Sequence, residues 1–436
     1  METKTSMAPL DSFQTMKNRT LYSVPARSAA KLAADWIRGG DLPDWPQFAR
    51  GVAILTYQCR DAIALACRLL GLQEGDEVLV PAYNCGTEID PIVQQKLHVR
   101  LYRVDAQARI DARDVACRVT EKTRAILVTH YFGWAQDLDP VIDLCRERGL
   151  YLIEDCAHAL FSASDCGWLG RYGDIAVYSL AKSLPVPHGG VAVLRDPEYS
   201  TGVQLRCSSP IQTLRDCLAL LRRHTLRTIG NTRLGSAAIL RWRRRREDVD
   251  AVDDASADLP DMPDECYFNQ DMATTRASRM VCGAMASTDV DQVITRRRRN
   301  YLHLFQSISD LTSIEPLFDS LPDGTCPLHL PILVSRRDCW VRELTSCGVY
   351  SLPWWAGYHR DLNWMGFEEA MALKDRVVTL PVHQGLTDET VDLIAETVRT
   401  VAQKLGQRKV QVRFASGTSE TRHDRDQETV PARPAQ

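Results

Sequence analysis

The sequence predicts an α/β fold, with a large domain built on a mostly parallel sheet flanked by helices and a smaller α+β domain after it. The first observation is a series of short apolar runs that alternate with helical segments. The second is a length of 436 residues with 44% hydrophobic residues, which is enough to fill two cores. The third is a long helical stretch after residue 265 that leads to a second group of strand and helix candidates.

The expected strands of the large domain are short and almost wholly apolar, so both faces of their sheet need cover. They lie at 77–80, 99–102, 125–129, 151–153, 175–178 and 190–194. A helix over Asp61–Leu70 precedes them and ends at Gly71, a residue type that often follows helix C termini. In the smaller domain we expect a strand near 328–334 and helices near 337–347 and 388–405.

The chain divides into five expected segments. These are an N-terminal arm over 1–50 with a short helix near 27–38, the large domain over 51–200, a helical insertion over 201–265, a connecting helix and small domain over 266–408, and a polar, disordered tail over 409–436. The insertion is basic through Arg241–Arg246 and then acidic. We favour a solvated face paired with those acids, and the alternative is a surface for an anionic partner, a membrane or a nucleotide diphosphate.

Composition excludes several classes of protein. A formal net charge of -3 gives no reason to expect nucleic-acid binding. No uncharged apolar stretch approaches the roughly 18 residues of a membrane span, and the first residues lack the pattern of a secretory signal. The 14 cysteines are scattered without a CxxC pair, so we expect free thiols and no metal. A cytoplasmic location is therefore the expectation.

Three segments supply the groups that bind a cofactor with a phosphate, a pyridine nitrogen and an aldehyde. Asp155 ends an apolar run, which places it at the carboxyl end of a strand, where open α/β sheets bind ligands. Lys182 follows the next run, and its amine can form an imine with an aldehyde. Residues 57–61 enter a helix whose free N–H groups can hold a phosphate. The cofactor with these three groups is pyridoxal 5'-phosphate (PLP), whose ring accepts electrons when a carboxylate keeps its nitrogen protonated.

Several segments also carry a family resemblance when they are taken in order. Residues 71–83, 153–159, 173–182, 189–190 and 380–389 resemble the DegT/DnrJ/EryC1/StrS aminotransferases. The resemblance runs from about residue 51 to 194 and from about 267 to 405. It implies the type I fold of PLP-dependent aminotransferases. It also implies transfer of an amino group, usually from glutamate, to the keto group of a nucleotide-linked sugar.

Carried over by residue, the resemblance implies that Lys182 is the Schiff-base lysine and that Asp155 is the partner of the ring nitrogen. It implies that His158 contacts the phenolic oxygen of the cofactor. Many members place an aromatic residue on the ring where this chain has Cys85, so Tyr83 is the candidate for that role. The implied phosphate ligands are Ser179, the backbone of Arg60 and Asp61, and Asn269 of a neighbouring subunit, which makes the enzyme a homodimer with shared sites.

Plainer interpretations exist for each residue. Asp155 could cap a helix, His158 could be a buried packing residue, and Trp354 and Trp355 could line a substrate entrance or pack within the small domain. For the whole protein, one alternative is another PLP reaction on the same fold, such as decarboxylation, racemisation or acyl condensation. The other is a non-catalytic scaffold that binds through the basic insertion. The keto acceptor stays open.

Overall fold

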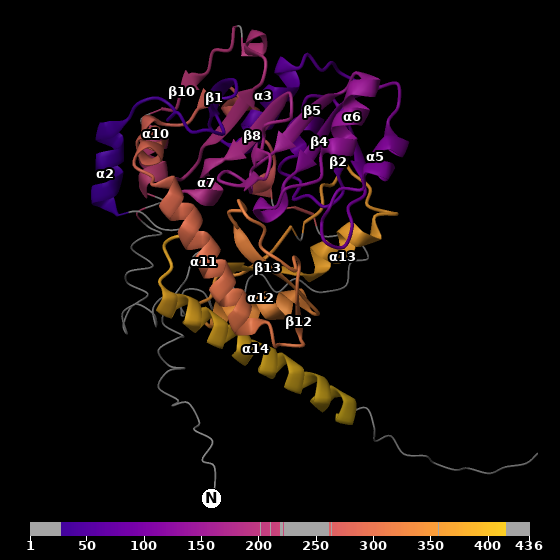
Figure 1. The fold of residues 1–436 in the computed structure, drawn as a ribbon, viewed down its shortest axis with the longest axis vertical. Coiled ribbons are helices and arrows are strands. Elements are labelled where there is room, and N and C mark those ends of the chain that lie inside the picture. Colours follow the sequence, from indigo (N-terminus) through magenta and orange to yellow (C-terminus); the bar gives the residue numbers. More distant parts are fainter. Residues whose placement is uncertain are drawn as a thin grey trace, which may run out of the picture.

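The computed structural model describes residues 28–200, 202–209, 211–218, 221, 261–262, 264–355 and 357–415. A large sheet with its helices forms the upper part of the molecule in Figure 1, and a smaller antiparallel sheet with long helices forms the lower part. Both parts of the α/β prediction are confirmed. No helix in the described residues is long and apolar enough to cross a membrane.

The large sheet has seven strands in the order β1-β9-β8-β5-β4-β2-β3. The five strands from β8 to β3 run parallel, whereas β9 runs antiparallel to both β8 and β1. The strands are β1 (Val52–Thr56), β2 (Glu77–Pro81), β3 (His98–Tyr102), β4 (Thr123–Thr129), β5 (Tyr151–Asp155), β8 (Ile175–Ser179) and β9 (Gly190–Leu194). Parallel strands place their carboxyl ends at one edge, and that edge carries the candidate site.

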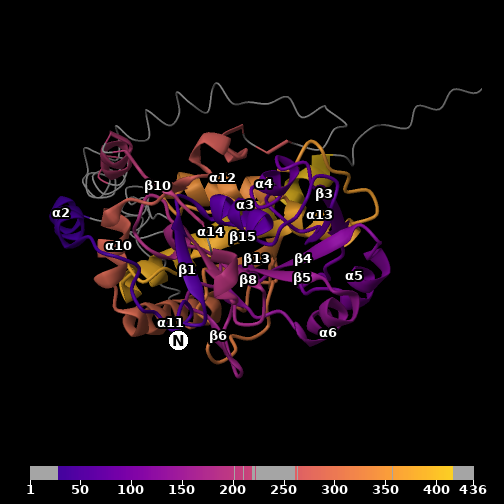
Figure 2. The ribbon, with the colours of Figure 1, turned by 90° about the horizontal axis from the view of Figure 1, so that it is seen from above.

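Helices cover both sides of this sheet. Figure 2 shows α3 (Cys59–Leu69) on one side, and α5 (Ala112–Arg118) and α6 (Asp139–Arg148) on the other. Helix α3 begins where the Asp61 carboxylate accepts a hydrogen bond from the Gln58 backbone N–H at 2.8 Å. It ends before Gly71, whose φ of +71° favours glycine. Its residues Ala62–Cys67 are buried, and the helix packs on β8 and β9.

The small domain contains an antiparallel sheet in the order β12-β13-β15-β14. Its strands are β12 (Ile314–Pro316), β13 (His329–Val334), β14 (Leu352–Pro353) and β15 (Val377–Pro381), and its helices are α12 (Arg337–Ser346), α13 (Glu368–Arg376) and α14 (Asp388–Ala415). The connecting helix α11 (Val290–Ile308) packs along α14 (Figure 1). Buried side chains of the two domains join in one hydrophobic core.

Several details differ from the sequence-based expectations. The expected N-terminal helix is α2 (Ala29–Arg38), but β1, which follows the arm, was not expected. Helix α14 continues past residue 408 to Ala415, and residues 416–436 of the expected tail lie outside the described residues. In the insertion, β10 (Arg206–Cys207) pairs in parallel with β11 (Thr275–Arg276), and residues 211–218 are helical. The Arg241–Arg246 run lies outside the described residues.

Candidate active site

Asp155 and Lys182 come from neighbouring parallel strands. Asp155 is the last residue of β5, and Lys182 lies in the single helical turn α7 (Leu180–Ser183) that directly follows β8. Strand β5 pairs with β8 through Asp155 opposite Val177. Burial raises the pKa of the Asp155 carboxyl to about 6, and the positive charge of Lys182 opposes that rise. The two side chains therefore share one region at the carboxyl edge of the sheet.

Asp155 is buried and only partly satisfied by the protein. Its Oδ1 accepts a hydrogen bond from the Ala157 N–H at 2.8 Å, in a turn rather than at the start of a helix. The helix-cap interpretation therefore does not describe this residue. A buried carboxylate that has one backbone donor and a nearby lysine can accept a further charged donor, such as a protonated ring nitrogen.

The phosphate ligands that we expected from within one subunit, Ser179 and the start of α3, lie close together. Ser179 is the last residue of β8 and pairs with Gly190 of β9. A Cβ at Gly190 would lie 2.3 Å from the carbonyl oxygen of Gln58, so the N terminus of α3 lies directly against this glycine. The Ser179 side chain forms no hydrogen bond within the part of the chain that the structure describes. A hydroxyl and a helix N terminus thus lie side by side, which is an arrangement that suits an anion.

The side chains of Arg60 and Asp61 form hydrogen bonds with the protein backbone. Arg60 donates hydrogen bonds from Nη1 to the carbonyl oxygens of Cys266 and Tyr267, at 2.6 and 2.9 Å. Asp61 caps α3, and burial raises its pKa to about 7 against the hydrogen bond from Gln58. Any contact of these two residues with a phosphate would therefore come from their main-chain N–H groups, and the N–H of Asp61 already donates to the carbonyl oxygen of Gln58 at 3.1 Å.

His158 presents an unused hydrogen-bond donor. Its Nδ1 accepts a hydrogen bond from the Phe132 N–H at 3.2 Å, so the neutral ring carries its proton on Nε2. Burial lowers the pKa of His158 well below its ordinary value, with a smaller effect from the charge of Lys182, and the ring is therefore neutral. Nε2 is buried without a partner in the described residues. Since buried donors are normally satisfied, this atom fits a contact to a bound group such as the phenolic oxygen of PLP.

Aromatic rings line the region beside His158. The centroid of the Trp355 ring lies 5.1 Å from that of His158 and 4.9 Å from that of Tyr83. Tyr83 is fully buried, and its hydroxyl has no partner in the described residues. Trp355 is half-buried, whereas Trp354 is buried against His158 and His329. Of the two tryptophans, Trp354 packs in the interior and Trp355 reaches the surface.

Asn269 lies apart from these groups and is exposed. Its Oδ1 accepts a hydrogen bond from the Asp271 N–H at 2.9 Å and caps the short helix η4 (Gln270–Met272). The segment before it is held by Arg60, as described above, and by Asp90, which accepts a hydrogen bond from the Phe268 N–H. Asp90 also pairs with the buried His359 at 3.0 Å. The structure thus fixes the backbone around Asn269 while its side chain stays at the surface.

The sequence matches the DegT/DnrJ/EryC1/StrS aminotransferase family over residues 48–399. The chain belongs to this family. It is therefore a PLP-dependent aminotransferase, and the PLP cofactor that the three segments suggested is confirmed.

Similar sugar aminotransferases share parts of the sequence. The chain is 34% identical over 135 residues to GDP-perosamine synthase of Vibrio cholerae, a match that covers 30% of this chain and 37% of that protein. It is 24% identical over 361 residues to dTDP-4-dehydro-2,3,6-trideoxy-D-glucose 4-aminotransferase of Saccharopolyspora spinosa, which covers 80% of this chain and 84% of that protein. The stronger match thus spans little more than a third of its relative.

Solved structures share the fold. The putative sugar aminotransferase Spr1654 from Streptococcus pneumoniae, in its PMP form, aligns with a TM-score of 0.64 at 18% identity, over 90% of this chain and all of that one. Helicobacter pylori PseC, an aminotransferase of pseudoaminic acid biosynthesis, aligns with a TM-score of 0.62 at 16% identity, over 88% of this chain and all of that one. The type I aminotransferase fold that the resemblance implied is confirmed.

This aminotransferase has two site neighbours, Glu88 and His329, that sequence reasoning missed. Cys85 lies 2.7 Å from an oxygen of the buried Glu88, and the charge of Lys182 acts on the thiol. Burial and Glu88 nevertheless raise the pKa of Cys85 to about 12, so the thiol is protonated. The Cys85–Glu88 spacing directly after β2 was the available signal, because β2 ends at the same edge as β5. His329 comes from β13 of the small domain, and no local pattern connects it with Lys182.

Lys374 of α13 connects the small domain to the same loop. Its ammonium donates hydrogen bonds to the carbonyl oxygens of Asn84, Trp355 and Gly357. The side chain is fully buried, and this burial lowers its pKa to about 8. Lys374 therefore holds the loop of Cys85 and Glu88 against the loop of Trp355.

A second buried cluster contains groups that could bind a metal. His130, Glu154 and Cys156 place their ligand atoms within 4.8 Å of one another. Hydrogen bonds already use the first two, because His130 pairs with Glu154 at 3.0 Å and Glu154 also accepts backbone N–H donors from Gly170, Tyr172 and Gly173. Glu154 therefore connects the His130 side chain to the backbone of residues 170–173 by hydrogen bonds.

Proposed function

We propose that this aminotransferase moves an amino group, supplied by glutamate, to the keto group of a nucleotide-linked sugar. The observation that supports this most is the position of Asp155 and Lys182 at the ends of adjacent parallel strands, beside the free donor of His158. The names of the Vibrio and Saccharopolyspora relatives support a nucleotide sugar as acceptor.

When it is bound, PLP supplies an aldehyde for the substrate amine and a ring that accepts electrons. The chain supplies the groups around it. We propose that Asp155 holds the proton on the ring nitrogen, that the Nε2 proton of His158 is donated to the phenolic oxygen, and that Lys182 binds the cofactor and then carries a proton within the site. Because Asp155 is buried, its charge acts strongly on a ring beside it.

For the phosphate we propose the Ser179 hydroxyl and the main-chain N–H groups of Arg60 and Asp61. The adjacency of Ser179, Gly190 and the start of α3 supports this assignment. We propose that the half-buried Trp355 faces the cofactor with Tyr83 behind it. Asn269 is exposed and its backbone is fixed, so we propose that it reaches the phosphate site of a second subunit in a homodimer.

Amino transfer from [15N]glutamate tests the reaction. The purified protein with PLP and a nucleotide-linked keto sugar should give a 15N-labelled amino sugar, detected by mass spectrometry. Decarboxylation or racemisation of amino acids without labelled product would assign another PLP reaction. If the protein bound no PLP, and if deletion of residues 211–246 abolished binding to a partner, the result would support the non-catalytic scaffold. Sedimentation should show a dimer. The Asn269→Ala variant should bind PLP more weakly but should remain a dimer.

A further inference from the structure

Trp355 has a backbone conformation that large side chains rarely adopt. Its φ angle is +60°, in the left-handed region, where the Cβ atom approaches the following carbonyl group. Five described residues other than glycine have a positive φ, and two of them, Phe132 and Trp355, place their rings 5.6 and 5.1 Å from that of His158. Backbone strain persists only where surrounding contacts hold it, and it is concentrated at functional sites. The strain at Trp355 therefore points to a contact that holds it and to a use for its ring.

Lys374 of α13 supplies that contact. Its ammonium donates a hydrogen bond to the carbonyl oxygen of Trp355 at 3.1 Å and another to that of Gly357 at 2.8 Å. The first acceptor belongs to the strained residue itself, and the second lies two residues further along the same loop. One nitrogen atom thus fixes the backbone that follows the left-handed residue.

The same ammonium joins this loop to the large domain. Its third hydrogen bond goes to the carbonyl oxygen of Asn84 at 2.5 Å, in the loop that follows β2 at the carboxyl edge of the sheet. The nitrogen also lies over the rings of Tyr358 and Trp364, 4.7 and 5.4 Å from their centroids. Lys374 therefore sets the position of the strained loop relative to the edge that carries the site.

A buried ammonium is a costly way to fill this space. Lys374 is 0% exposed, and burial lowers its pKa to about 8 against the charges of Cys85 and Glu88. At pH 7 its three N–H groups meet three carbonyl groups. Methionine has a similar length and would occupy the same volume without the cost of burying a charge. The benefit of lysine thus lies in the backbone that it holds.

We propose that Lys374 is a positioning residue for amino transfer, which holds Trp355 in its strained conformation so that the ring lies beside His158 and the bound cofactor. Lys374 acts through the loop and not by contact with the cofactor. The inference rests on the proposed place of Trp355 at the cofactor, and it adds the group that keeps the ring there. Without the three hydrogen bonds, Trp355 would relax to a negative φ and its ring would leave His158.

Circular dichroism of bound PLP tests this with the full-length enzyme, because the signal in the visible absorption band depends on the aromatic rings around the cofactor. Trp355→Ala should change the amplitude of the band. Lys374→Met should change it in the same direction, and the double variant should match Trp355→Ala alone, because both substitutions remove the same ring from the same place. The affinity of Lys374→Met for PLP should stay within about twofold of the wild type, because the proposed phosphate ligands lie elsewhere.

Kinetics give a second measurement. With labelled glutamate, Lys374→Met should lower kcat/KM on the order of 10- to 100-fold, and it should lower it little further when Trp355→Ala is already present. Lys96→Met is the control, because Lys96 is an exposed lysine that pairs with Glu74 at 3.0 Å, and it should change neither the rate nor the dichroism. A wild-type enzyme that transferred no label would refute the proposed donor, and the dichroism would then decide the role of Lys374 by itself.

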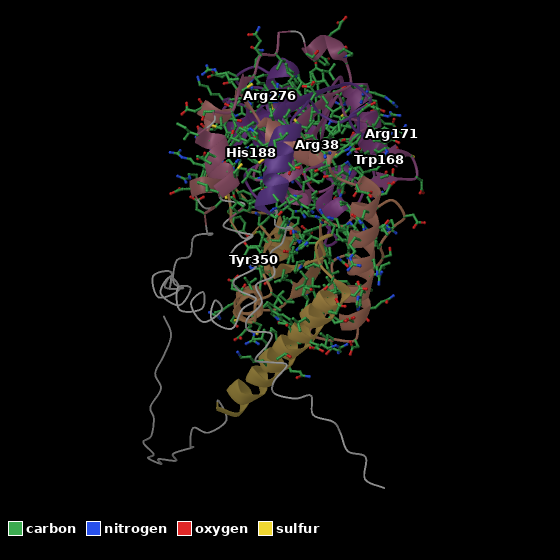
Figure 3. The ribbon with its side chains drawn as sticks, turned by 90° about the vertical axis from the view of Figure 1, so that its left-hand side faces the viewer. Arg38, Trp168, Arg171, His188, Arg276 and Tyr350 are labelled. Carbon is green, nitrogen blue, oxygen red and sulfur yellow. The ribbon has the colours of Figure 1, made fainter. Side chains whose placement is uncertain are left out.

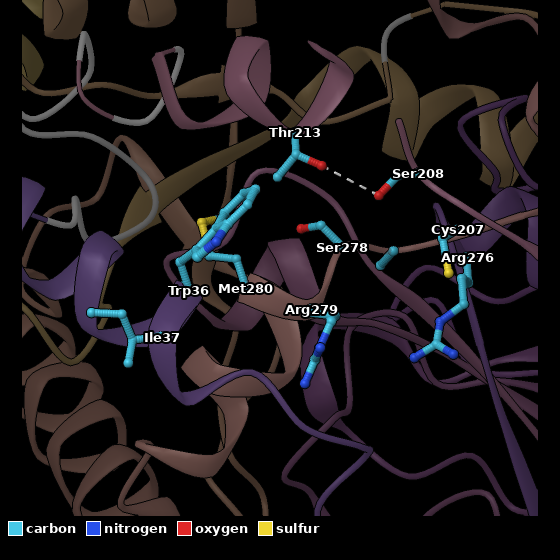
Figure 4. Close-up of a pocket in the computed structure, with 10 residues that line it drawn as sticks. Trp36, Ile37, Cys207, Ser208, Thr213, Arg276, Ser278, Arg279 and Met280 are labelled. Atoms are coloured by element: carbon cyan, nitrogen blue, oxygen red, sulfur yellow. Dashed lines mark hydrogen bonds between the residues drawn. The ribbon is translucent and has the colours of Figure 1, made fainter. Parts of the chain in front are cut away.

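Two other tryptophans provide controls for the ring. Figure 3 shows Trp168 on the large domain, and Figure 4 shows Trp36 at a cavity of about 340 Å³ between α2 and α10 (Arg279–Ala286). Neither is among the rings beside His158 in the described residues. Trp168→Phe and Trp36→Phe should therefore leave the dichroism of bound PLP as it is.

A further variant covers the case in which Lys374→Met does not fold. The same substitution combined with Trp355→Gly should then fold, because glycine adopts a φ near +60° without strain and does not need the hydrogen bonds. If that double variant also failed to fold, Lys374 would serve the whole fold, and the proposal would be wrong. An unchanged band in Lys374→Met, where Trp355→Ala alters it, would overturn the proposal, as would a band that Trp355→Ala itself leaves unchanged.

Discussion

Replacing Asp155 with asparagine should stabilise the protein without its cofactor and weaken its hold on PLP. Asp155 is 4% exposed, and its pKa is raised from 3.8 to about 6. A carboxyl with a raised folded-state pKa contributes its stability below the unfolded pKa and loses it as pH rises through the folded pKa. Between pH 4 and 6 the folded protein should therefore lose about 3 kcal/mol through this one group.

Asparagine carries no charge, so the Asp155→Asn protein lacks this loss. In urea unfolding of the cofactor-free protein, the variant should match the wild type near pH 4. It should exceed the wild type by up to about 3 kcal/mol at pH 8. Its affinity for PLP should fall about 10- to 150-fold, because the charge-assisted hydrogen bond of about 1.5–3 kcal/mol to the ring nitrogen is lost.

The exposed Asp165 supplies the control, since Asp165→Asn removes one carboxylate far from the site and should change neither quantity. The reasoning would be refuted if Asp155→Asn were less stable than the wild type at pH 8 while it still bound PLP with unchanged affinity. In that case the buried charge would be stabilised by the protein itself, and it would not be held for a cofactor.

Two further predictions concern the phosphate end of the site. Gly190→Ala should destabilise the protein by more than about 2 kcal/mol in thermal unfolding, or displace α3, because the added methyl group would meet the Gln58 backbone. The control is Gly406→Ala on α14, where the methyl group would enter open space. This control should be neutral or should stabilise the protein by about 0.5–1 kcal/mol. Asp61→Asn should raise PLP affinity about two- to fivefold at pH 8, because its carboxyl, with a pKa of about 7, is then charged in the first turn of α3 and repels the phosphate. In absorbance titrations the wild-type affinity should fall as pH rises through 7 and the variant affinity should stay level, and an equal fall in both would contradict the phosphate assignment.

The sequence was most informative where chemistry follows directly from a strand. All six strands expected in the large domain are present, and Asp155 and Lys182 each follow an apolar run, so their shared edge could be predicted from parallel pairing alone. Strands β1, β12, β14 and β15 were not expected. β12 and β14 have only three and two residues, which leaves little periodicity to detect, whereas β15 is a buried strand between β13 and β14.

Contacts between domains could not be predicted in the same way. His329 and Trp355 reach the region of His158 from the small domain, and Lys374 joins three carbonyl groups from two loops. These arrangements depend on how the two sheets pack, which local spacing does not encode. The side-chain role of Arg60 was also out of reach, because its partners lie more than 200 residues later in the sequence. The cap that Asp61 forms with Gln58 is a local contact that spacing could have indicated.

The most direct test of the account is to reduce the PLP-loaded protein with borohydride and to locate the resulting cofactor adduct by peptide mass spectrometry. The account predicts a phosphopyridoxyl group on the peptide that contains Lys182 and on no other lysine, and its loss in Lys182→Ala. An adduct on Lys374, or an imine absorption band that persists in Lys182→Ala, would contradict it.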